Sequence, residues 1–467
     1  MPSFYVENFG CRATQADGAA IEEQFRERGL TRAEHPQSAR FVVLNTCAVT
    51  ASAEQDARAA IRRVRRENPG CEVIVTGCYA QRAPQEVASL PGVSFVIGNS
   101  HKNSLAQISL RTEQQETSLT DFVPVTHLAN GNHSPTSSIH VSDIFAHTEL
   151  IAAPVFDSAN ERTRPNLKVQ DGCNNRCSFC IIPSVRGRSR SLKLDEVLRE
   201  VNQLVESGYR EVVISGINLG RWGRDLQDQT VWRGHSRPPT LEDLVRAILD
   251  DTSLEKLRIS SVEPMDWTDS FIRMMADSPR IAKHAHAPMQ SGSDAVLRRM
   301  HRKYRPWHYR EKIEKIRTAM PTAAIGADVM VGFPGETYRE FQETRRMIEE
   351  LPFTYLHVFT FSARPGTPAA TMPNQVPVLV ARERNRILRE LAAKKKQAFM
   401  REFVGQKIEA ITLNVTSETA DGICTEALTV NYLKLRVKGT HQPNRWFKAH
   451  ISSVGNDHLV GNISRVI

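Results

Sequence analysis

Short apolar runs alternate with amphipathic stretches along the first hundred residues of the chain. These runs predict strands at Ser3–Asn8, Phe41–Thr46, Glu72–Thr76 and Val93–Ile97. Helices are predicted between them over Asp17–Arg28 and Ser52–Glu67, with Thr50 or Ser52 placed to cap the second helix. Because strands that alternate with helices form parallel sheets, the chain is expected to open with an α/β domain over residues 1–113.

The regular pattern dissolves over residues 114–163, where polar stretches such as NGNHSPTSS hold no period for long. We interpret this region as a linker or insertion between domains. A second α/β series follows over residues 164–380, with helices such as Leu194–Ser207 and Leu241–Leu249. Its predicted strands are Leu167–Gln170, Glu211–Ser215, Lys256–Ser260, Ile281–Ala287, Ala324–Val331 and Tyr355–Phe361. Six βα units predict a partial (β/α)6 barrel, less closed than the eight-fold form.

The last part of the chain departs from this α/β pattern. Residues 381–403 are predicted to form a basic linker helix, which carries Lys394, Lys395 and Lys396 and which a solvated surface would explain equally well. Residues 404–467 show short alternating strands with turn residues between them. A small β-barrel fits a stretch of that length and pattern.

Length and charge narrow the class of protein only moderately. A chain of 467 residues is too long for one ordinary core, which agrees with two or three domains. No apolar run of membrane-spanning length and no secretory leader are evident, so we expect a cytoplasmic protein without a membrane partner. The formal net charge of +9 permits a polyanionic partner such as RNA without requiring one.

The strongest chemical signal is DGCNNRCSFCIIP, in which Cys173, Cys177 and Cys180 have C-x3-C-x2-C spacing. Thiolates hold iron–sulfur clusters, and three ligands on a four-iron cubane leave one iron open. The loop follows the first strand of the second series, so it lies at the carboxyl end of the barrel, where such folds place their active sites. A zinc knuckle or three structural cysteines are the alternatives, although zinc normally takes four ligands.

Weaker motifs suggest where a cofactor would bind. Gly216 in ISGINLG directly follows a predicted strand, although an ordinary βα turn would explain it as well. Arg188, with its neighbours in RGRSRS, could bind a carboxylate or phosphate, or could face solvent. Gln290, together with His284 and His286, is a candidate for the same pocket, and the histidines could equally be structural.

Three further cysteines follow strands of the first domain. Cys11, Cys47 and Cys78 come after the first, second and third predicted strands, whereas Cys71 precedes its strand. Because the carboxyl ends of parallel strands share one edge, the first three are expected to converge and could hold a second cluster. Burial as small apolar side chains is the open alternative, and no partnered histidine suggests a catalytic thiol.

With both cysteine sets in place, the chain resembles the methylthiotransferase family from end to end. NFGCRATQAD, NTCAVTASAEQDAR and TGCYAQ match the three N-terminal cysteine motifs of the family, and QDGCNNRCSFCIIPSVRGRSRS matches its radical S-adenosylmethionine motif. RISSVEP, HAPMQSGSDAVLRRMHRKY and GADVMVGFPGET match its barrel segments, and TVNYLKLRVKG is similar to the centre of a TRAM domain. The resemblance therefore implies an N-terminal domain, a radical S-adenosylmethionine domain and a C-terminal TRAM domain.

The resemblance also implies cofactors and a reaction. Two 4Fe-4S clusters are expected, one on Cys173, Cys177 and Cys180 and an auxiliary one on Cys11, Cys47 and Cys78. The first would reduce S-adenosyl-L-methionine to a 5′-deoxyadenosyl radical, which removes a hydrogen atom from an unactivated carbon. The auxiliary cluster would supply or relay sulfur, and a second S-adenosylmethionine would supply the methyl group. A flavodoxin- or ferredoxin-like electron donor is implied as well.

The substrate is the finer question. NTCAVT and TGCYAQ look most like the group that acts on N6-threonylcarbamoyladenosine, 3′ of the tRNA anticodon. Tyr79 stands where relatives acting on N6-isopentenyladenosine usually carry Met, and a third branch modifies an aspartate of a ribosomal protein. A non-catalytic iron–sulfur RNA-binding protein would not need an open iron. Tyr432 and Trp446 of the last domain could stack on bases, although core packing is the simpler role.

Overall fold

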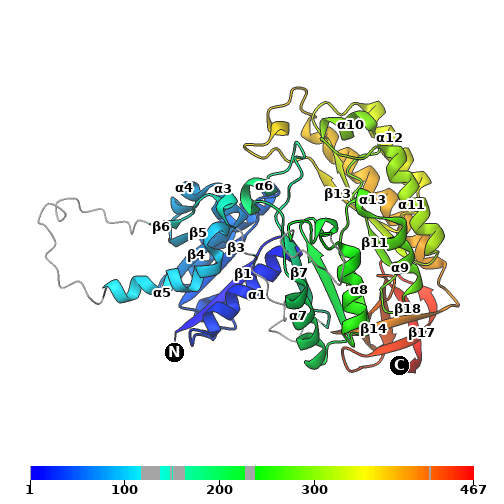
Figure 1. Ribbon diagram of the computed structural model, residues 1–467, viewed down its shortest axis with the longest axis horizontal. Coiled ribbons are helices and arrows are strands. Elements are labelled where there is room, and N and C mark those ends of the chain that lie inside the picture. Colours follow the sequence, from blue (N-terminus) through cyan, green and yellow to red (C-terminus); the bar gives the residue numbers. More distant parts are fainter. Residues whose placement is uncertain are drawn as a thin grey trace, which may run out of the picture. The chain divides into compact units, whose positions relative to one another are not determined.

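The computed structural model describes residues 2–116, 137–147, 150, 163–226, 237–419 and 422–466. Its internal contacts divide the chain into two compact units. The first comprises Met1–Val155, Asp171–Asn175 and Cys180–Arg188, and the second comprises Phe156–Gln170, Arg176–Phe179 and Ser189–Ile467. The chain thus returns to the first unit twice after leaving it (Figure 1).

A parallel sheet with the strand order β2-β1-β3-β4-β5-β6 forms the centre of the first unit. Its strands are β1 (Ser3–Asn8), β2 (Thr31–Arg32), β3 (Phe41–Thr46), β4 (Glu72–Gly77), β5 (Val93–Gly98) and β6 (Ser138–His140). Alternate residues of β3 face opposite sides, Val42 toward one apolar core and Val43 toward another. Burial on both faces explains the unbroken apolar run in the sequence and confirms the predicted parallel sheet.

Helices cover both faces of this sheet. They are α1 (Arg12–Arg26), α2 (Ala51–Glu67), α3 (Cys78–Arg82), α4 (Pro84–Ala88) and α5 (Leu105–Glu116), with a 3-10 turn η2 (Asn99–Ser104) before α5. Thr50 caps α2, because its hydroxyl oxygen accepts a hydrogen bond of 3.2 Å from the backbone N–H of Ala53. Cys71 is buried at the amino end of β4, as expected, and burial raises the pKa of its thiol.

The region interpreted as a linker or insertion contributes to this unit. Within residues 114–163, Ser138–His140 pairs in parallel with β5 as the edge strand β6, and Ile144–Ala146 forms a 3-10 turn, η4. A three-residue edge strand leaves no detectable period, so it could not be recognised from the sequence. The remainder, residues 117–136, 148–149 and 151–162, lies outside the described residues.

The second unit contains parallel strands that form the partial barrel. They are β7 (Asn166–Asp171), β9 (Glu211–Gly216), β10 (Lys256–Ile259), β11 (His284–His286), β12 (Ala324–Val331) and β13 (Tyr355–Thr360), and β8 (Arg190–Ser191) lies beside β7 at the edge. Single bridges from Leu257 to Ile281 and from Ser261 to His286 join β10 to β11. The predicted strand Ile281–Ala287 is therefore shorter in the structure, with continuous pairing over His284–His286 only.

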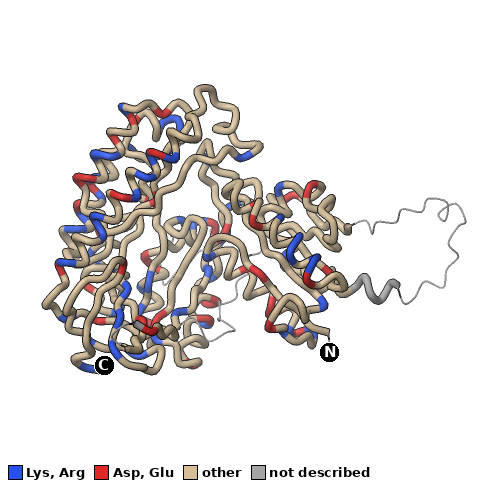
Figure 2. Tube along the Cα trace, turned by 180° about the vertical axis from the view of Figure 1, so that it is seen from behind, with Lys and Arg blue, Asp and Glu red and all other residues tan. Residues whose placement is uncertain are grey.

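Helices follow these strands, and α6 (Ile182–Arg186) belongs to the first unit. The helices that cover the outer face of the barrel are α7 (Leu194–Glu206), α8 (Leu241–Asp251), α9 (Asp269–Asp277), α10 (Asp294–Arg299), α11 (Pro306–Ala319), α12 (Tyr338–Glu350) and α13 (Val378–Arg401). Basic and acidic residues alternate along the helices of the second unit (Figure 2). On α13, Lys395 donates to the backbone oxygen of Glu349, and Lys396 donates to that of Asp457. These two lysines therefore join α13 to neighbouring segments of the unit.

The chain ends in a closed barrel with the strand order β14-β15-β16-β18-β17. Its strands are β14 (Lys407–Thr419), β15 (Gly422–Thr429), β16 (Lys434–Lys438), β17 (Trp446–Val454) and β18 (Leu459–Val466). This confirms the predicted small β-barrel. Trp446 is buried in it, and the ring of Tyr432 lies 4.5 Å from that of His284, so both aromatic side chains serve packing. Among the described residues, no helix is both long and apolar enough to cross a membrane.

Candidate metal centres

Three cysteines lie at one edge of the N-terminal sheet. Cys11 follows β1 and precedes α1, Cys47 follows β3 directly, and Cys78 is the first residue of α3 after β4. Since β1, β3 and β4 are neighbours in parallel, their carboxyl ends share an edge. The structure therefore brings these three cysteines to the same edge, as the order of motifs predicted.

The approach between the first two cysteine loops is close. Gly10, which precedes Cys11, has φ +106°, and a Cβ on it would lie 2.8 Å from Cβ and 3.0 Å from Sγ of Cys47. A side chain at position 10 would therefore clash with the Cys47 thiol as well as strain the backbone. Burial, followed by the nearby Cys78 thiol, raises the pKa of Cys47 to about 12, although the hydrogen bond from the backbone N–H of Val49 and the charge of Arg186 act in the opposite direction.

Each thiol of this set has a polar neighbour. The hydroxyl of Thr14 lies 3.7 Å from Sγ of Cys11, and the backbone N–H of Val49 donates to Sγ of Cys47 over 3.5 Å. The Asn99 amide donates to Sγ of Cys78 over 3.6 Å. Hydrogen bonds to sulfur are one of the means by which proteins adjust an iron–sulfur cluster.

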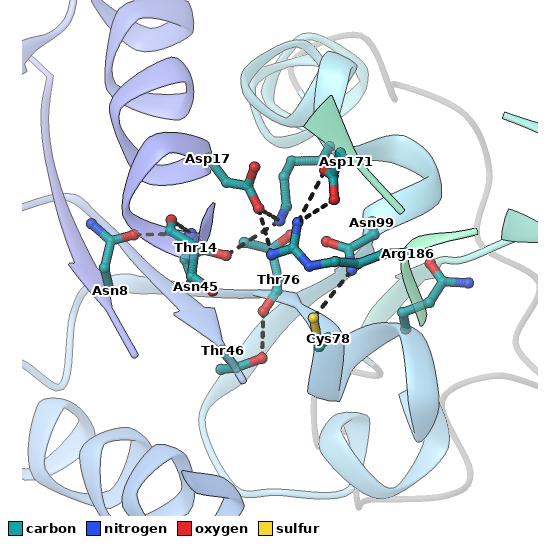
Figure 3. Close-up of polar contacts among 12 residues, drawn as sticks. Asn8, Thr14, Asp17, Asn45, Thr46, Thr76, Cys78, Asn99, Asp171 and Arg186 are labelled. Atoms are coloured by element: carbon teal, nitrogen blue, oxygen red, sulfur yellow. Dashed lines mark hydrogen bonds and ion pairs between the residues drawn. The ribbon is translucent and has the colours of Figure 1, made fainter. Parts of the chain in front are cut away.

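Four buried charged side chains form a group in the first unit, and Figure 3 shows Asp17, Asp171 and Arg186 of this group in the same region as Cys78. Arg186 donates to both carboxylate oxygens of Asp171 at 3.0 Å and to Asp17 at 2.9 Å. Lys102 donates to the same oxygen of Asp17 at 2.9 Å. We call Asp17, Lys102, Asp171 and Arg186 the buried quartet. Their side chains are at most 8% exposed, which is unusual for ionised groups.

The sequence predicted only one member of this quartet as a candidate. Arg186 was considered as one of three arginines that could bind a carboxylate, and it does bind two. Asp17, Lys102 and Asp171 come from α1, η2 and the end of β7, and no local pattern relates these segments. Only the tertiary structure identifies such a group.

The second cysteine set lies on the loop between β7 and α6. Cys173 and Cys180 belong to the first unit and Cys177 to the second. The backbone N–H of Asn175 donates to Sγ of Cys173 at 3.4 Å. The Arg302 guanidinium donates to Sγ of Cys177 at 3.2 Å, and it also forms an ion pair with Glu263. Each of these two sulfurs thus accepts a hydrogen bond.

The predicted cofactor-binding residues fall in different environments. Gly216 ends β9, and a Cβ there would lie 2.8 Å from Oε1 of Gln170, so a protein side chain already explains this glycine. Gln290 follows β11 with φ +62°, a strained conformation for a residue that is not glycine. Arg188 is exposed in the first unit.

His284 and His286 of β11 surround Tyr355 of β13, and β12 lies between these two strands in the sheet. Nε2 of His284 lies 2.6 Å and Nδ1 of His286 lies 2.9 Å from the hydroxyl of Tyr355. His286 also lies 3.2 Å from a carboxylate oxygen of Asp328. Both histidines are buried and hydrogen-bonded within the protein, as the structural alternative predicted.

The donor chemistry of both cysteine sets suits iron–sulfur clusters. In the part of the chain that the structure describes, no three His, Cys, Asp or Glu side chains are grouped to hold one metal ion. A cubane places its thiolates on separate irons, so its ligands stand farther apart than the ligands of a single ion. Thiol-only sets with hydrogen bonds to sulfur therefore fit cubane clusters better than a mononuclear zinc site.

Tyr79 is held by side chains of its own unit. It is fully buried, its hydroxyl donates to Glu86 at 2.9 Å and accepts from Arg58 at 2.8 Å, and its ring packs under the Arg82 guanidinium. Burial, followed by the hydrogen bond to Glu86, raises the pKa of this hydroxyl to about 12. Tyr79 is therefore a packing residue of the first unit.

Two protein families match the chain. The Uncharacterized protein family UPF0004 matches residues 3–98, and the Radical SAM superfamily matches residues 167–348. The chain is 36% identical to the threonylcarbamoyladenosine tRNA methylthiotransferase MtaB of Bacillus subtilis, over 100% of this chain and 97% of that protein. It is 33% identical to MtaB of Aquifex aeolicus over 93% and 96% of the two chains.

Other proteins resemble the chain over smaller shares. The tRNA-2-methylthio-N(6)-dimethylallyladenosine synthase of Corynebacterium efficiens is 32% identical over 88% of this chain and 74% of its own. Among solved structures, the radical S-adenosylmethionine methyltransferase TsrM of Kitasatospora setae aligns with a TM-score of 0.53 at 14% identity, over 79% of this chain and 77% of that chain. At that identity the likeness shows a shared fold only.

Proposed function

The chain belongs to the family of radical S-adenosylmethionine tRNA methylthiotransferases, and we propose on that premise that it methylthiolates N6-threonylcarbamoyladenosine 3′ of the tRNA anticodon. The observation that carries this proposal is the 36% identity over the full chain to a relative named for that substrate. Domain organisation agrees, since the matches span both α/β parts of the chain.

A family of this kind uses a 4Fe-4S cluster and S-adenosylmethionine. We assign that cluster to Cys173, Cys177 and Cys180. When bound, the cluster and S-adenosylmethionine supply the radical chemistry that a carbon without acidic hydrogen requires. Arg302, through its hydrogen bond to Cys177 and its ion pair with Glu263, fixes the orientation of that thiolate.

We assign a second, auxiliary 4Fe-4S cluster to Cys11, Cys47 and Cys78. Support comes from their position at one sheet edge, from the contact between Gly10 and Cys47, and from the hydrogen-bond donors at each sulfur. Cys11, Cys47 and Cys78 would hold this cluster, and the chemistry that it would supply there is the delivery of sulfur. Gly216, Gln290 and Arg188 remain our candidates for contacts to S-adenosylmethionine.

The partners follow from the reaction. We propose tRNA as the substrate and a flavodoxin- or ferredoxin-like protein as the electron donor, with the enzyme acting in the cytoplasm. The terminal barrel (β14–β18), which we propose to be a TRAM domain, has a net positive sequence charge that suits RNA. A methylthiotransferase acting on N6-isopentenyladenosine is the second candidate, because a relative of 32% identity is named for that base.

The test is mass spectrometry of tRNA nucleosides from cells with the gene, without it, and with the gene restored. We expect 2-methylthio-N6-threonylcarbamoyladenosine to disappear on deletion and to return with the intact gene and with a Cys424→Ala variant. A Cys177→Ala variant should not restore it. Loss of the methylthio-isopentenyl nucleoside instead would reassign the substrate, and unchanged nucleosides would refute a tRNA substrate and direct the search to a ribosomal-protein aspartate.

A further inference from the structure

The buried quartet joins three distant parts of the first unit. Asp17 lies on α1, Lys102 on η2, and Asp171 and Arg186 lie on either side of the loop that carries Cys173, Cys177 and Cys180. Lys102 also donates to Oδ1 of Asn45 at 3.4 Å, on the strand that leads to Cys47. The quartet is therefore connected to the segments that bear both cysteine sets.

The charges of the N-terminal cysteines influence both positive members of the quartet. Burial alone would lower the pKa of Arg186, but Asp171, Asp17 and the thiols of Cys78 and Cys11 raise it above the usual value. Burial lowers the pKa of Lys102, while Asp17 and Cys78 act in the opposite direction. Both cations thus interact electrostatically with at least one thiol of the set.

A hydrogen-bond bridge fixes this arrangement. The Asn99 amide nitrogen donates to Sγ of Cys78 at 3.6 Å and to the backbone oxygen of Val185 at 2.7 Å. Val185 directly precedes Arg186 and is fully buried in the core beneath α3. The bridge thus holds the backbone beside Arg186 close to Cys78, and two ion pairs hold the guanidinium itself.

A purely structural role does not account well for the quartet. Removing several ionised groups from water costs several kcal/mol per ion, and apolar replacements of similar volume are often more stable. Four ionised side chains at most 8% exposed, placed beside three thiols, therefore suggest a use for the charge.

We propose that Arg186 and Lys102 are positioning residues for the auxiliary cluster, and that the fixed positive charge of Arg186 favours the reduced state of that cluster. The inference rests on the auxiliary cluster proposed above. Reduction adds a negative charge to the cluster, so a fixed cation nearby makes reduction less costly. An arginine keeps its charge at every relevant pH.

The proposal has a consequence for how the two cysteine sets are related. Arg186 follows Cys180 within the segment Cys180–Arg188, which belongs to the first unit. One segment therefore provides a ligand for the first cluster and a cation for the auxiliary one. An auxiliary cluster with its proper potential would require this segment to be folded in place.

The test measures the auxiliary cluster alone. The full chain with Cys173, Cys177 and Cys180 all changed to Ala is reconstituted anaerobically with iron and sulfide. Its midpoint potential is then measured by a redox titration followed by electron paramagnetic resonance. The variants are Arg186→Gln, Arg186→Lys and, as a control, Arg26→Gln, which also removes a guanidinium from ion pairs but lies at the far end of α1 from Cys11.

For Arg186→Gln we expect the ratio of reduced to oxidised cluster at a fixed potential to fall at least tenfold, about 59 mV for one electron. The same ratio should fall less in Arg186→Lys, and in Arg26→Gln it should lie within twofold of the ratio in the parent chain. The proposal would also be supported if Arg186→Gln lost its iron while Arg186→Lys and Arg26→Gln retained it, provided that the circular dichroism spectrum of Arg186→Gln was unchanged. An unchanged potential at full iron content would overturn it.

A second variant keeps the proposal testable if Arg186→Gln does not fold. The pair Arg186→Gln with Asp171→Asn removes one charge of each sign and leaves Asp17 paired with Lys102. Because the loss of the Asp171 carboxylate offsets part of the lost positive charge, a smaller fall in potential than in Arg186→Gln is expected, and a potential at or above that of the parent would overturn the proposal. If the parent chain bound no cluster at all, the auxiliary site itself would be refuted. None of these readings depends on tRNA, so they are separate from the nucleoside test.

Discussion

A buried ion pair in the second unit allows a quantitative test of the structure. Nε of Arg258 lies 2.6 Å from Oε1 of Glu211, and the two side chains are 1% and 0% exposed. The same guanidinium reaches the backbone oxygens of Thr429 and Val430 at 3.4 Å, so it ties β10 to the terminal barrel. Arg258 is the first residue of the RISSVEP motif. The structure gives this motif residue a structural role.

Changing Arg258 to Met would leave the Glu211 carboxylate buried beside one remaining cation. Breaking a buried pair by removing one partner costs about 3–5 kcal/mol. Arg164 still lies 3.5 Å from Glu211, so a loss near the lower end, about 3 kcal/mol, is expected. The control is Arg246→Met, from an i,i+4 surface pair with Glu242, which should cost about 0.5 kcal/mol or less.

The assay is urea unfolding of the apo chain followed by tryptophan fluorescence. Trp222 and Trp267 are 0% and 1% exposed in the core of this unit, so their emission reports its unfolding. A loss below about 1 kcal/mol for Arg258→Met would refute the assignment of a buried, ionised pair. The double variant Glu211→Gln with Arg258→Met should recover part of the loss, because no charge is then left unpaired.

The pH dependence provides an independent check. Burial would raise the pKa of Glu211, but Arg258 and Arg164 outweigh it, and the pKa lies below its ordinary value. A carboxylate with a lowered folded pKa stabilises the protein above its unfolded pKa, and this contribution is lost as the pH falls through the folded value. The difference between wild type and Arg258→Met should thus be largest near neutrality and shrink below about pH 4.

Two further predictions concern the metal centres. Gly10→Ala should lower the free energy of unfolding by about 1–3 kcal/mol and should reduce the iron content of the chain in which Cys173, Cys177 and Cys180 are changed to Ala. The control is Gly29→Ala, at φ +79° with nothing within 4 Å, which should keep its iron. Equal iron content in the two variants would contradict the predicted clash. Arg302→Gln should lower the midpoint potential of the first cluster, because Sγ of Cys177 loses a charged hydrogen-bond donor at 3.2 Å. The potential is measured in a chain with Cys11, Cys47 and Cys78 changed to Ala. An unchanged potential would count against that hydrogen bond.

Much of the fold follows from local patterns in the sequence. The strands Phe41–Thr46 and Ala324–Val331 have the predicted bounds, and the first of them opens with an unbroken apolar run because it is buried on both faces. Short or polar elements leave no such signal, so β2 and β6 were not predicted. The helix predicted over Asp17–Arg28 begins at Arg12 in the structure, because its first turns are rich in polar and small residues that do not reveal a helical period.

The residues of the candidate sites likewise divide into those that the sequence could group and those that only the structure brings together. Cys11, Cys47 and Cys78 could be grouped in advance because sheet topology relates the ends of neighbouring strands, and β1, β3 and β4 are neighbours. Lys102 and Asp171 could not be linked to them, since a long-range ion pair imposes no spacing on the chain. Burial of Lys102 at 3% exposure is visible only once the sheet and η2 are in place.

The segment Cys180–Arg188 also limits how this protein can be divided or recombined. Its residues Ile181 and Val185 complete the core of the first unit, although the chain on either side belongs to the second. A fragment ending at Val155 would lack these side chains and would leave Asp17 without Arg186. A chimaera that exchanges the first unit between relatives must therefore also exchange the segment Cys180–Arg188. The first unit is thus encoded by stretches of the gene that are not contiguous.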